Sequence, residues 1–234
     1  MKTSLKQKIA ISVFWIVLVT SFLFFATLLN LKANGWVLNT QTWRLFKTGM
    51  ISLNGNPPTA KIEVNGKFRN DYLPYKIAKL APGNYEVTIS SPNYKTWQKN
   101  IRVEEGQASI YENVKLFFTN PTDVSVPQDV TVDLVKSNSS NRQSDVRVSG
   151  GEIYYRNNLV SRFSSNVATA VLYPDEYHII YQINDEIRVI ELDGGNNQLL
   201  FRLNSTEPTW FSFQNNSRTI HYLDQGKVLG KVIR

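Results

Sequence analysis

Few residues in this chain of 234 residues have the types and spacing needed for catalysis. The two histidines, His178 and His221, cannot share a metal site with a thiolate because the chain contains no cysteine. We expect each to be an ordinary strand residue rather than a metal ligand. The acidic pairs Glu104-Glu105, Asp175-Glu176 and Asp185-Glu186 fall at predicted turns, and neighbours in a strand point to opposite faces. Such pairs rarely form a two-carboxylate catalytic site, so we expect solvated turns.

Motifs for nucleophilic catalysis and for phosphate binding are absent from the sequence. It contains neither a Gly-x-Ser-x-Gly elbow nor a glycine-rich phosphate loop. Aromatic residues such as Trp43, Trp97 and Trp210 could stack on sugar rings, but packing within β domains explains them better. The sequence therefore predicts no enzyme, no cofactor and no metal site.

The longest apolar run, Ile9–Leu31, has 23 residues without charge, Gly or Pro. As a helix it spans about 34 Å, enough to cross a hydrocarbon core of roughly 30 Å. The prediction is a transmembrane anchor that includes Ile9, Phe14, Trp15, Phe24 and Leu31. A cleaved signal peptide is the alternative, but Leu31-Lys32-Ala33 places Leu where such a cleavage site needs a small residue.

The orientation of this anchor follows from Lys2, Lys6 and Lys8, which lie in a tail of eight residues that has no acid. The positive-inside tendency keeps that tail in the cytoplasm, so the bulk of the chain lies outside the membrane. Trp36 suits the interfacial aromatic belt about as well as an ordinary packing role.

The net charge of +7 is unevenly distributed. Residues 1–102 carry the whole basic excess, whereas residues 103–234 are net acidic. A basic band near a membrane suits anionic wall polymers or lipid headgroups, and simple solvation of a β domain is an equal alternative. Nucleic acid is not expected. The candidate contacts for an anionic partner are Lys61, Lys67, Arg69, Lys76, Lys79, Lys95, Lys99 and Arg102.

From Gly49 onward, short alternating runs broken by Gly, Pro and Asn predict an all-β region. Ala60, Ile62 and Val64 alternate with charged residues, and Asn65-Gly66 then predicts a tight hairpin turn. The ordered series of motifs in this region resembles the PEGA domain, a small extracytoplasmic β-sandwich, and this resemblance implies a binding or spacing module without catalytic residues. The resemblance rests on Pro58, Ala60, Asn65, Gly66, Pro74, Pro82, Gly83, Tyr85, Val87 and Tyr94.

The C-terminal third contains a repeat. Leu172–Tyr181 and Phe211–Tyr222 are each followed by a second strand-like run, and Tyr181 lies 41 residues before Tyr222. With Pro208-Thr209-Trp210, this unit resembles the repeats of TolB-like and WD40-like β-propellers. About two such units are present, so the region is a partial propeller, a small open β domain or an array completed by another chain. In the connector before it, Val130–Val135 is a candidate strand.

The predicted fold is thus an all-β ectodomain, a PEGA-like β-sandwich plus propeller-like antiparallel repeats, behind one N-terminal transmembrane helix. Its predicted parts are a cytoplasmic tail (1–8), the anchor (9–31), a juxtamembrane spacer (32–48), the PEGA-like domain (49–119), a connector (120–150) and the repeats (151–234).

This organisation predicts a non-catalytic binding or scaffold protein of the bacterial cytoplasmic membrane. Its partner would be wall polymer, glycan or another protein. The alternatives are an envelope hydrolase acting on glycan or peptide through the propeller-like region, and a sensor ectodomain that signals through a membrane partner.

Overall fold

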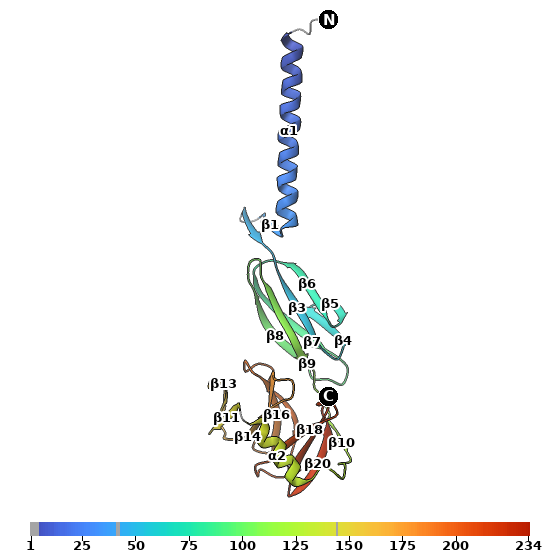
Figure 1. The fold of residues 1–234 in the computed structure, drawn as a ribbon, viewed down its shortest axis with the longest axis vertical. Coiled ribbons are helices and arrows are strands. Elements are labelled where there is room, and N and C mark those ends of the chain that lie inside the picture. The colour runs from blue at the N-terminus through green and yellow to red at the C-terminus, as the bar shows by residue number, and fades with distance from the viewer. Residues whose placement is uncertain (1–4, 41–42, 144) are drawn as a thin grey trace. The chain divides into compact units, whose positions relative to one another are not determined.

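The computed structural model describes residues 5–40, 43–143 and 145–234 of the chain. Within these residues the protein is mostly β, with 20 strands and two helices (Figure 1). The chain divides into two compact units, each assembled from separate segments. The first comprises residues 1–52, 76–85 and 101–110, and the second comprises residues 53–75, 86–100 and 111–234.

Helix α1, Leu5–Ala33, contains the whole predicted apolar run. Its segment Lys8–Ala33 has a mean hydropathy of 2.5, and none of it is buried in the protein. The hydroxyls of Thr20 and Thr27 donate to the carbonyl oxygens of Ile16 and Leu23, each at 2.8 Å, so these polar groups are satisfied within the helix. The length and composition of α1 fit a membrane span or a signal sequence. Among the residues predicted to orient it, Lys6 and Lys8 lie in α1, and Lys2 lies outside the described residues.

The predicted spacer after α1 contains a small hairpin. Strands β1 (Trp36–Asn39) and β2 (Arg44–Lys47) form a separate two-stranded antiparallel sheet. The amide of Thr48 closes its base by donating to the Gly35 carbonyl oxygen at 2.8 Å. Alternation over so few residues gives a weak sequence signal, which is why the hairpin was not predicted.

Residues 49–115 form two sheets with strand orders β6-β3-β9 and β5-β4-β7-β8. The Asn65-Gly66 turn is confirmed, because both residues have positive φ, 50° and 69°, and Val64 pairs with Lys67 across it. Ala60, Ile62 and Val64 are buried on one face of β4, as their alternation predicted. The strands are β3 (Gly49–Asn56), β4 (Thr59–Val64), β5 (Lys67–Tyr72), β6 (Tyr75–Leu80), β7 (Gly83–Ser90), β8 (Trp97–Val103) and β9 (Ala108–Lys115).

The rest of the chain forms three sheets, with strand orders β11-β12-β13, β14-β15-β16-β17 and β10-β20-β19-β18. Strand β10 therefore completes the sheet of the last three strands, with Thr122 opposite Val232. The strands are β10 (Thr122–Val124), β11 (Val146–Ser149), β12 (Glu152–Tyr155), β13 (Asn158–Arg162), β14 (Val167–Leu172), β15 (His178–Ile183), β16 (Glu186–Glu191), β17 (Gln198–Arg202), β18 (Phe211–Gln214), β19 (Thr219–Asp224) and β20 (Lys227–Val232).

The sheet β14–β17 is buried on both faces. Ile180 belongs to a core cluster with Phe211 and Ile220 of the last sheet, whereas its neighbour Ile179 belongs to another cluster with Ile153 of β12. Because the two faces pack against different sheets, five of the six residues of β15 are buried. This double burial explains why β15 lacks the alternation of apolar and polar residues that is typical of a strand with one solvent-exposed face.

The predicted strand Val130–Val135 is wrong, because helix α2, Val132–Arg142, begins within it. Thr131 caps this helix by accepting a hydrogen bond from the Leu134 amide at 3.3 Å. Ser and Asn fill much of the helix and are weak helix formers, so the sequence pattern favoured a loop. Packing offsets that weakness, since Val135 is fully buried in a cluster with Leu223.

Candidate functional site

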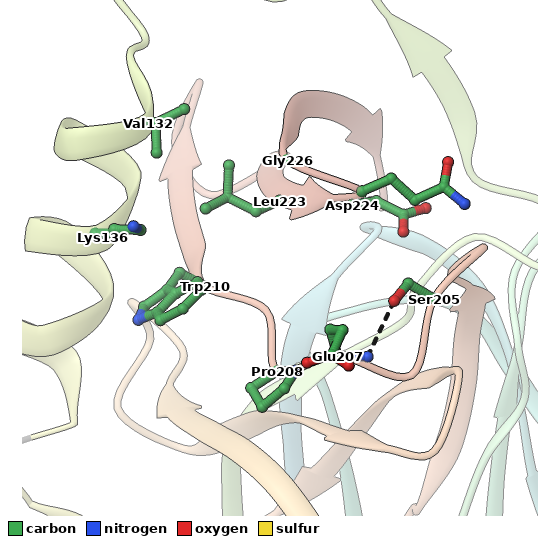
Figure 2. Close-up of a pocket in the computed structure, with 10 residues that line it drawn as sticks. Val132, Lys136, Ser205, Glu207, Pro208, Trp210, Leu223, Asp224 and Gly226 are labelled. Carbon is green, nitrogen blue, oxygen red and sulfur yellow. Dashed lines mark hydrogen bonds between the residues drawn. The ribbon is translucent and has the colours of Figure 1, made fainter.

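The candidate site is a cavity of about 350 Å³ in the second unit (Figure 2). Its walls come from helix α2, from the loop between β17 and β18, and from the turn between β19 and β20. The residues that line it are Val132, Lys136, Ser205, Glu207, Pro208, Trp210, Leu223, Asp224, Gln225 and Gly226.

Trp210 and Lys136 lie next to each other in the wall of this cavity (Figure 2). The Lys136 ammonium lies 5.0 Å from the centroid of the Trp210 ring, within the range of a cation–π interaction. Trp210 is half-buried and packs against the cluster of Val135 and Leu223. The cavity therefore has an aromatic wall that is held by apolar packing on one side and approached by a cation on the other.

Buried hydrogen bonds fix the loop that carries Trp210. The fully buried side chain of Gln182 accepts from the Thr209 amide at 2.9 Å and donates to the Glu207 carbonyl oxygen at 3.0 Å. The Thr209 hydroxyl donates to the Leu223 carbonyl oxygen and accepts from the Leu223 amide. Because these bonds satisfy the buried backbone of the loop, the cavity wall is preorganised rather than flexible.

Asp224 places a buried carboxylate at the cavity. The residue is 5% exposed, and Oδ2 accepts from the amide and the side-chain nitrogen of Asn204 at 2.8 and 2.9 Å. The other oxygen, Oδ1, is buried and has no hydrogen-bond partner within the described part of the chain. A buried acceptor without a partner is costly, so this carboxylate is only partly satisfied in the structure.

The chemistry of this cavity suits a small polar ring. Trp210, Leu223 and Pro208 supply apolar surface, and the carboxylates of Glu207 and Asp224 supply acceptors. Aromatic surface with a few polar groups around it is the usual make-up of a site for a small ligand. In the sequence, Trp210 stands out in Pro208-Thr209-Trp210 but is expected to pack in a core, and there is no signal for Lys136, Glu207 or Asp224.

The basic residues predicted to contact an anionic partner are dispersed over several strands. Lys67 and Arg69 are both exposed on the same face of β5. Lys76 and Lys79 are exposed on β6, where the φ of 59° at Lys79 breaks the alternation and both Ile77 and Leu80 are buried. Lys61 pairs with Glu63 at 2.6 Å, and Arg102 lies 3.9 Å from Glu104.

Lys99 and Lys95 are half-buried rather than free on a surface. The Lys99 ammonium pairs with the carboxylates of Glu191 and Asp193. Burial alone would lower the pKa of Lys99, but the hydrogen bonds and charges of these two carboxylates outweigh it and raise the pKa. Burial and the nearby charge of Arg188 lower the pKa of Lys95. The structure thus leaves two exposed pairs among the predicted basic residues, Lys67 with Arg69 on β5 and Lys76 with Lys79 on β6.

The histidines and acidic pairs occupy different environments. His221 is 1% exposed, burial lowers its pKa, and neither ring nitrogen has a partner among the described residues. His178 contacts Asp175, whose side chain is only 6% exposed, so the expectation of a solvated turn is wrong for Asp175. The amides of Tyr177 and His178 bind its carboxylate and hold it inward. Within the residues that the structure describes, no three metal-binding side chains come together.

The residues that carry the PEGA resemblance have structural positions. Asn65 accepts a hydrogen bond from the Glu86 amide at 2.9 Å, Tyr85 donates to the Ala81 carbonyl oxygen at 2.8 Å, and Tyr94 packs on Phe118 with ring centroids 4.7 Å apart. The other members comprise buried Ala60 and Val87, turn residue Gly66, and exposed Pro58, Pro74, Pro82 and Gly83.

The residues predicted for the anchor lie along α1. Ile9, Phe14, Trp15 and Phe24 are exposed on the helix, and Leu31 is half-buried near its end.

Comparison with known proteins supports one part of this picture. None of the curated proteins matches the chain. The resemblance of the C-terminal region to propeller repeats stays a prediction. The resemblance of the first β region to the PEGA domain is confirmed, because the family model of that domain matches residues 48–116.

Proposed function

We propose that this chain is a single-pass membrane protein of the bacterial cell envelope that binds glycan outside the cytoplasmic membrane, without catalysis. Its N-terminus would lie in the cytoplasm, and the PEGA domain and the three C-terminal sheets would lie outside. Helix α1 supports the anchor, because its segment of 26 residues is apolar and has no protein surface covering it. A bilayer would cover that surface.

The cavity at Trp210 is the observation that carries the binding function. Its lining combines the half-buried ring of Trp210, the carboxylates of Glu207 and Asp224, and the side chain of Gln225. A sugar ring presents an apolar face and hydroxyl donors in the same arrangement. The exposed Lys67 and Arg69 of β5 supply a second, electrostatic contact for an acidic wall polymer.

The strand order supports a propeller-like arrangement for the C-terminal region. Two of its sheets have four strands, and one of these is completed by β10, which precedes the other three strands in sequence. Closure of the last blade by an earlier strand is the arrangement that a propeller-like array would use to protect its edge. Three sheets and helix α2 would then form a short array rather than a closed ring.

Binding of soluble glycan fragments, prepared from bacterial cell walls, to the full-length chain in detergent tests this proposal. Calorimetric titration should give saturable binding that Trp210→Ala weakens by about tenfold, equivalent to ~1.4 kcal/mol. Tyr177→Ala is the matched control, because Tyr177 is an exposed aromatic residue that does not line the cavity. Absence of saturable binding, or equal losses in both variants, would overturn the assignment of the site.

One observation favours an envelope hydrolase as a second candidate, namely that Glu207 and Asp224 line the same cavity. Two carboxylates flanking one bond can act as acid and base or nucleophile in glycoside hydrolysis. Release of new reducing ends from wall glycan, lost in both Glu207→Gln and Asp224→Asn, would establish this function. Binding without such release, retained in Glu207→Gln, would favour the non-catalytic proposal.

A further inference from the structure

The hairpin β1–β2 presents a face that is mostly apolar. In the antiparallel register Leu38 lies opposite Leu45, and Trp36 lies opposite Lys47. Because side chains alternate along a strand, Leu38, Leu45 and Trp36 share one face, with Lys47 at its edge opposite Trp36. Trp43 lies directly before β2.

These apolar side chains have no protein to cover them. Trp43 is 79% exposed, Leu45 is 53% exposed and Leu38 is 42% exposed. The hairpin is a separate sheet of two strands, and a sheet of this size is marginally stable in water. Burial of this face against another surface would therefore stabilise the hairpin.

Helix α1 sets where that covering surface lies. Only Asn34 and Gly35 separate the last residue of α1 from the first residue of β1. The base of the hairpin is fixed by the hydrogen bond from Thr48 to Gly35 and by the Lys47 amide, which donates to Glu105 Oε1 at 2.6 Å. The hairpin is thus held beside the C-terminal end of the apolar helix.

The charges carried by the hairpin itself and by the end of α1 are of one sign, although the Glu105 carboxylate accepts from the Lys47 amide. They belong to Lys32, Arg44 and Lys47, and the first acidic residue of the chain is Glu63. Exposed Trp and Leu next to Arg and Lys is the composition of segments that lie in the interface of an anionic bilayer.

We propose that the hairpin β1–β2 lies in the headgroup layer of the lipid bilayer, with Leu38, Leu45 and Trp43 inserted and Arg44 and Lys47 on anionic lipid. This inference rests on the proposed membrane anchor. The hairpin is then a second attachment to the same membrane surface, and its contact with Glu105 connects that attachment to the turn between β8 and β9. A protein that hangs from one helix can pivot, whereas one held at two points has a set orientation to the membrane.

Single-cysteine labelling tests this inference, because the chain has no cysteine of its own. An environment-sensitive fluorophore is placed at Leu45→Cys or Leu38→Cys in the full-length protein, which is reconstituted in phosphatidylcholine vesicles with or without phosphatidylglycerol. Leu18→Cys within α1 reports on the anchor, and Lys67→Cys at the tip of the β4–β5 turn is the aqueous control.

Both hairpin labels should show blue-shifted emission, quenching by lipids spin-labelled near the headgroup and protection from an aqueous quencher. The Lys67→Cys label should show none of these effects. The double variant Arg44→Glu with Lys47→Glu should reduce the shift in vesicles that contain phosphatidylglycerol. Aqueous emission from both hairpin labels, with the Leu18→Cys label in the bilayer, would overturn this inference alone. Aqueous emission from the Leu18→Cys label would overturn the anchor itself.

Discussion

The ammonium of Lys115 lies 2.8 Å from Oδ2 of Asp175, and His178 Nδ1 lies at the same distance from that oxygen. Lys115 ends strand β9 of the PEGA domain, whereas Asp175 lies in the turn between β14 and β15. The side chains of Lys115 and Asp175 are 15% and 6% exposed, so the pair is largely shielded from water. This ion pair joins the end of the PEGA domain to the central C-terminal sheet within the second unit.

Asp175→Asn should therefore destabilise the second unit. The substitution leaves Lys115 nearly buried without its counter-charge, and we expect a loss of about 3 kcal/mol. Chemical unfolding of the full-length protein in detergent, followed by near-ultraviolet circular dichroism, measures the change. Asp185→Asn is the control, because the partner of Asp185, Arg202, is 55% exposed and such a pair contributes below about 1 kcal/mol. Equal losses in the two variants would contradict the role of the shielded pair.

The same carboxylate predicts the behaviour of the protein in acid. Burial would raise the pKa of Asp175, but His178 and Lys115 outweigh it and lower the pKa to about 2. The stabilisation is thus present above the ordinary carboxyl pKa and is lost as the pH falls toward 2. Unfolding curves between pH 5 and about 2 should show this loss in the wild type and a weaker pH dependence in Asp175→Asn.

His221 predicts a separate pH dependence near neutrality. Burial lowers its pKa below the ordinary value, although the charge of Asp129 opposes this effect. The unfolded chain then binds a proton more readily than the folded chain, so stability is complete above about pH 6.5 and falls as the pH drops below it. His221→Phe keeps a ring in the strand and removes the titrating group.

Melting temperatures at about pH 7.5 and about pH 5.5, on either side of the ordinary histidine pKa of about 6.5, measure the effect of His221. The wild type should lose melting temperature on acidification, and His221→Phe should lose less. The direct comparison is between the wild type and His221→Phe in the same series of buffers. His178→Phe cannot serve as a control, because His178 contacts Asp175. A parallel fall in the two proteins would show that His221 does not carry the dependence.

The sequence predicted those elements that depend on residues close together in the chain. The Asn65-Gly66 turn follows from two residues that tolerate positive φ, and the buried row of β4 follows from simple alternation. Helix α2 was missed because Ser and Asn weaken its intrinsic propensity, while its stability comes from Val135 packing against Leu223 far along the chain.

The site could be predicted only in part for the same reason. Trp210 belongs to a motif that can be read from the sequence, but the cavity also needs Lys136 from α2 and Asp224 from the end of β19. Neither residue has a local signal, because each gains its role from a neighbour brought close by the fold. Lys99 shows the opposite case. The sequence places it in a basic stretch, but the fold pairs its ammonium with the carboxylates of Glu191 and Asp193.

Lys99 accordingly gives a prediction about stability instead of anion binding. Glu191 accepts hydrogen bonds from Lys99, from the Trp97 indole and from Asn196, and its side chain is 12% exposed. Lys99→Met leaves this carboxylate without a charged partner, and we expect a loss of about 2 kcal/mol. Hydrogen exchange should accelerate in β8 and in residues 193–196.

Lys61→Met is the matched control for Lys99, because Lys61 pairs with Glu63 but is 52% exposed. We expect its cost to stay below about 1 kcal/mol, with no change in exchange at residues 193–196. Suppose that Lys99→Met left the free energy of unfolding and the hydrogen exchange unchanged, whereas Lys61→Met altered them. The shielded cluster around Lys99 would then not be a source of stability.

Two glycines of the PEGA domain should respond very differently to the same substitution. A Cβ at Gly55 of β3 would lie 2.1 Å from the Val114 carbonyl oxygen and 2.8 Å from Val114 Cβ. A Cβ at Gly66 would meet nothing within 4 Å, but the residue has a φ of 69°. Gly55→Ala must therefore displace backbone, whereas Gly66→Ala incurs only the cost of a left-handed conformation.

We expect Gly55→Ala to cost about 3 kcal/mol or more, because strand β9 has to move away from β3. Gly66→Ala should cost about 1 kcal/mol, and Gly66→Asn should recover most of that loss because Asn tolerates positive φ. Melting temperatures of the three full-length variants in detergent give the order. A larger loss in Gly66→Ala than in Gly55→Ala would mean that the close approach of β3 to Val114 is not present in the folded protein.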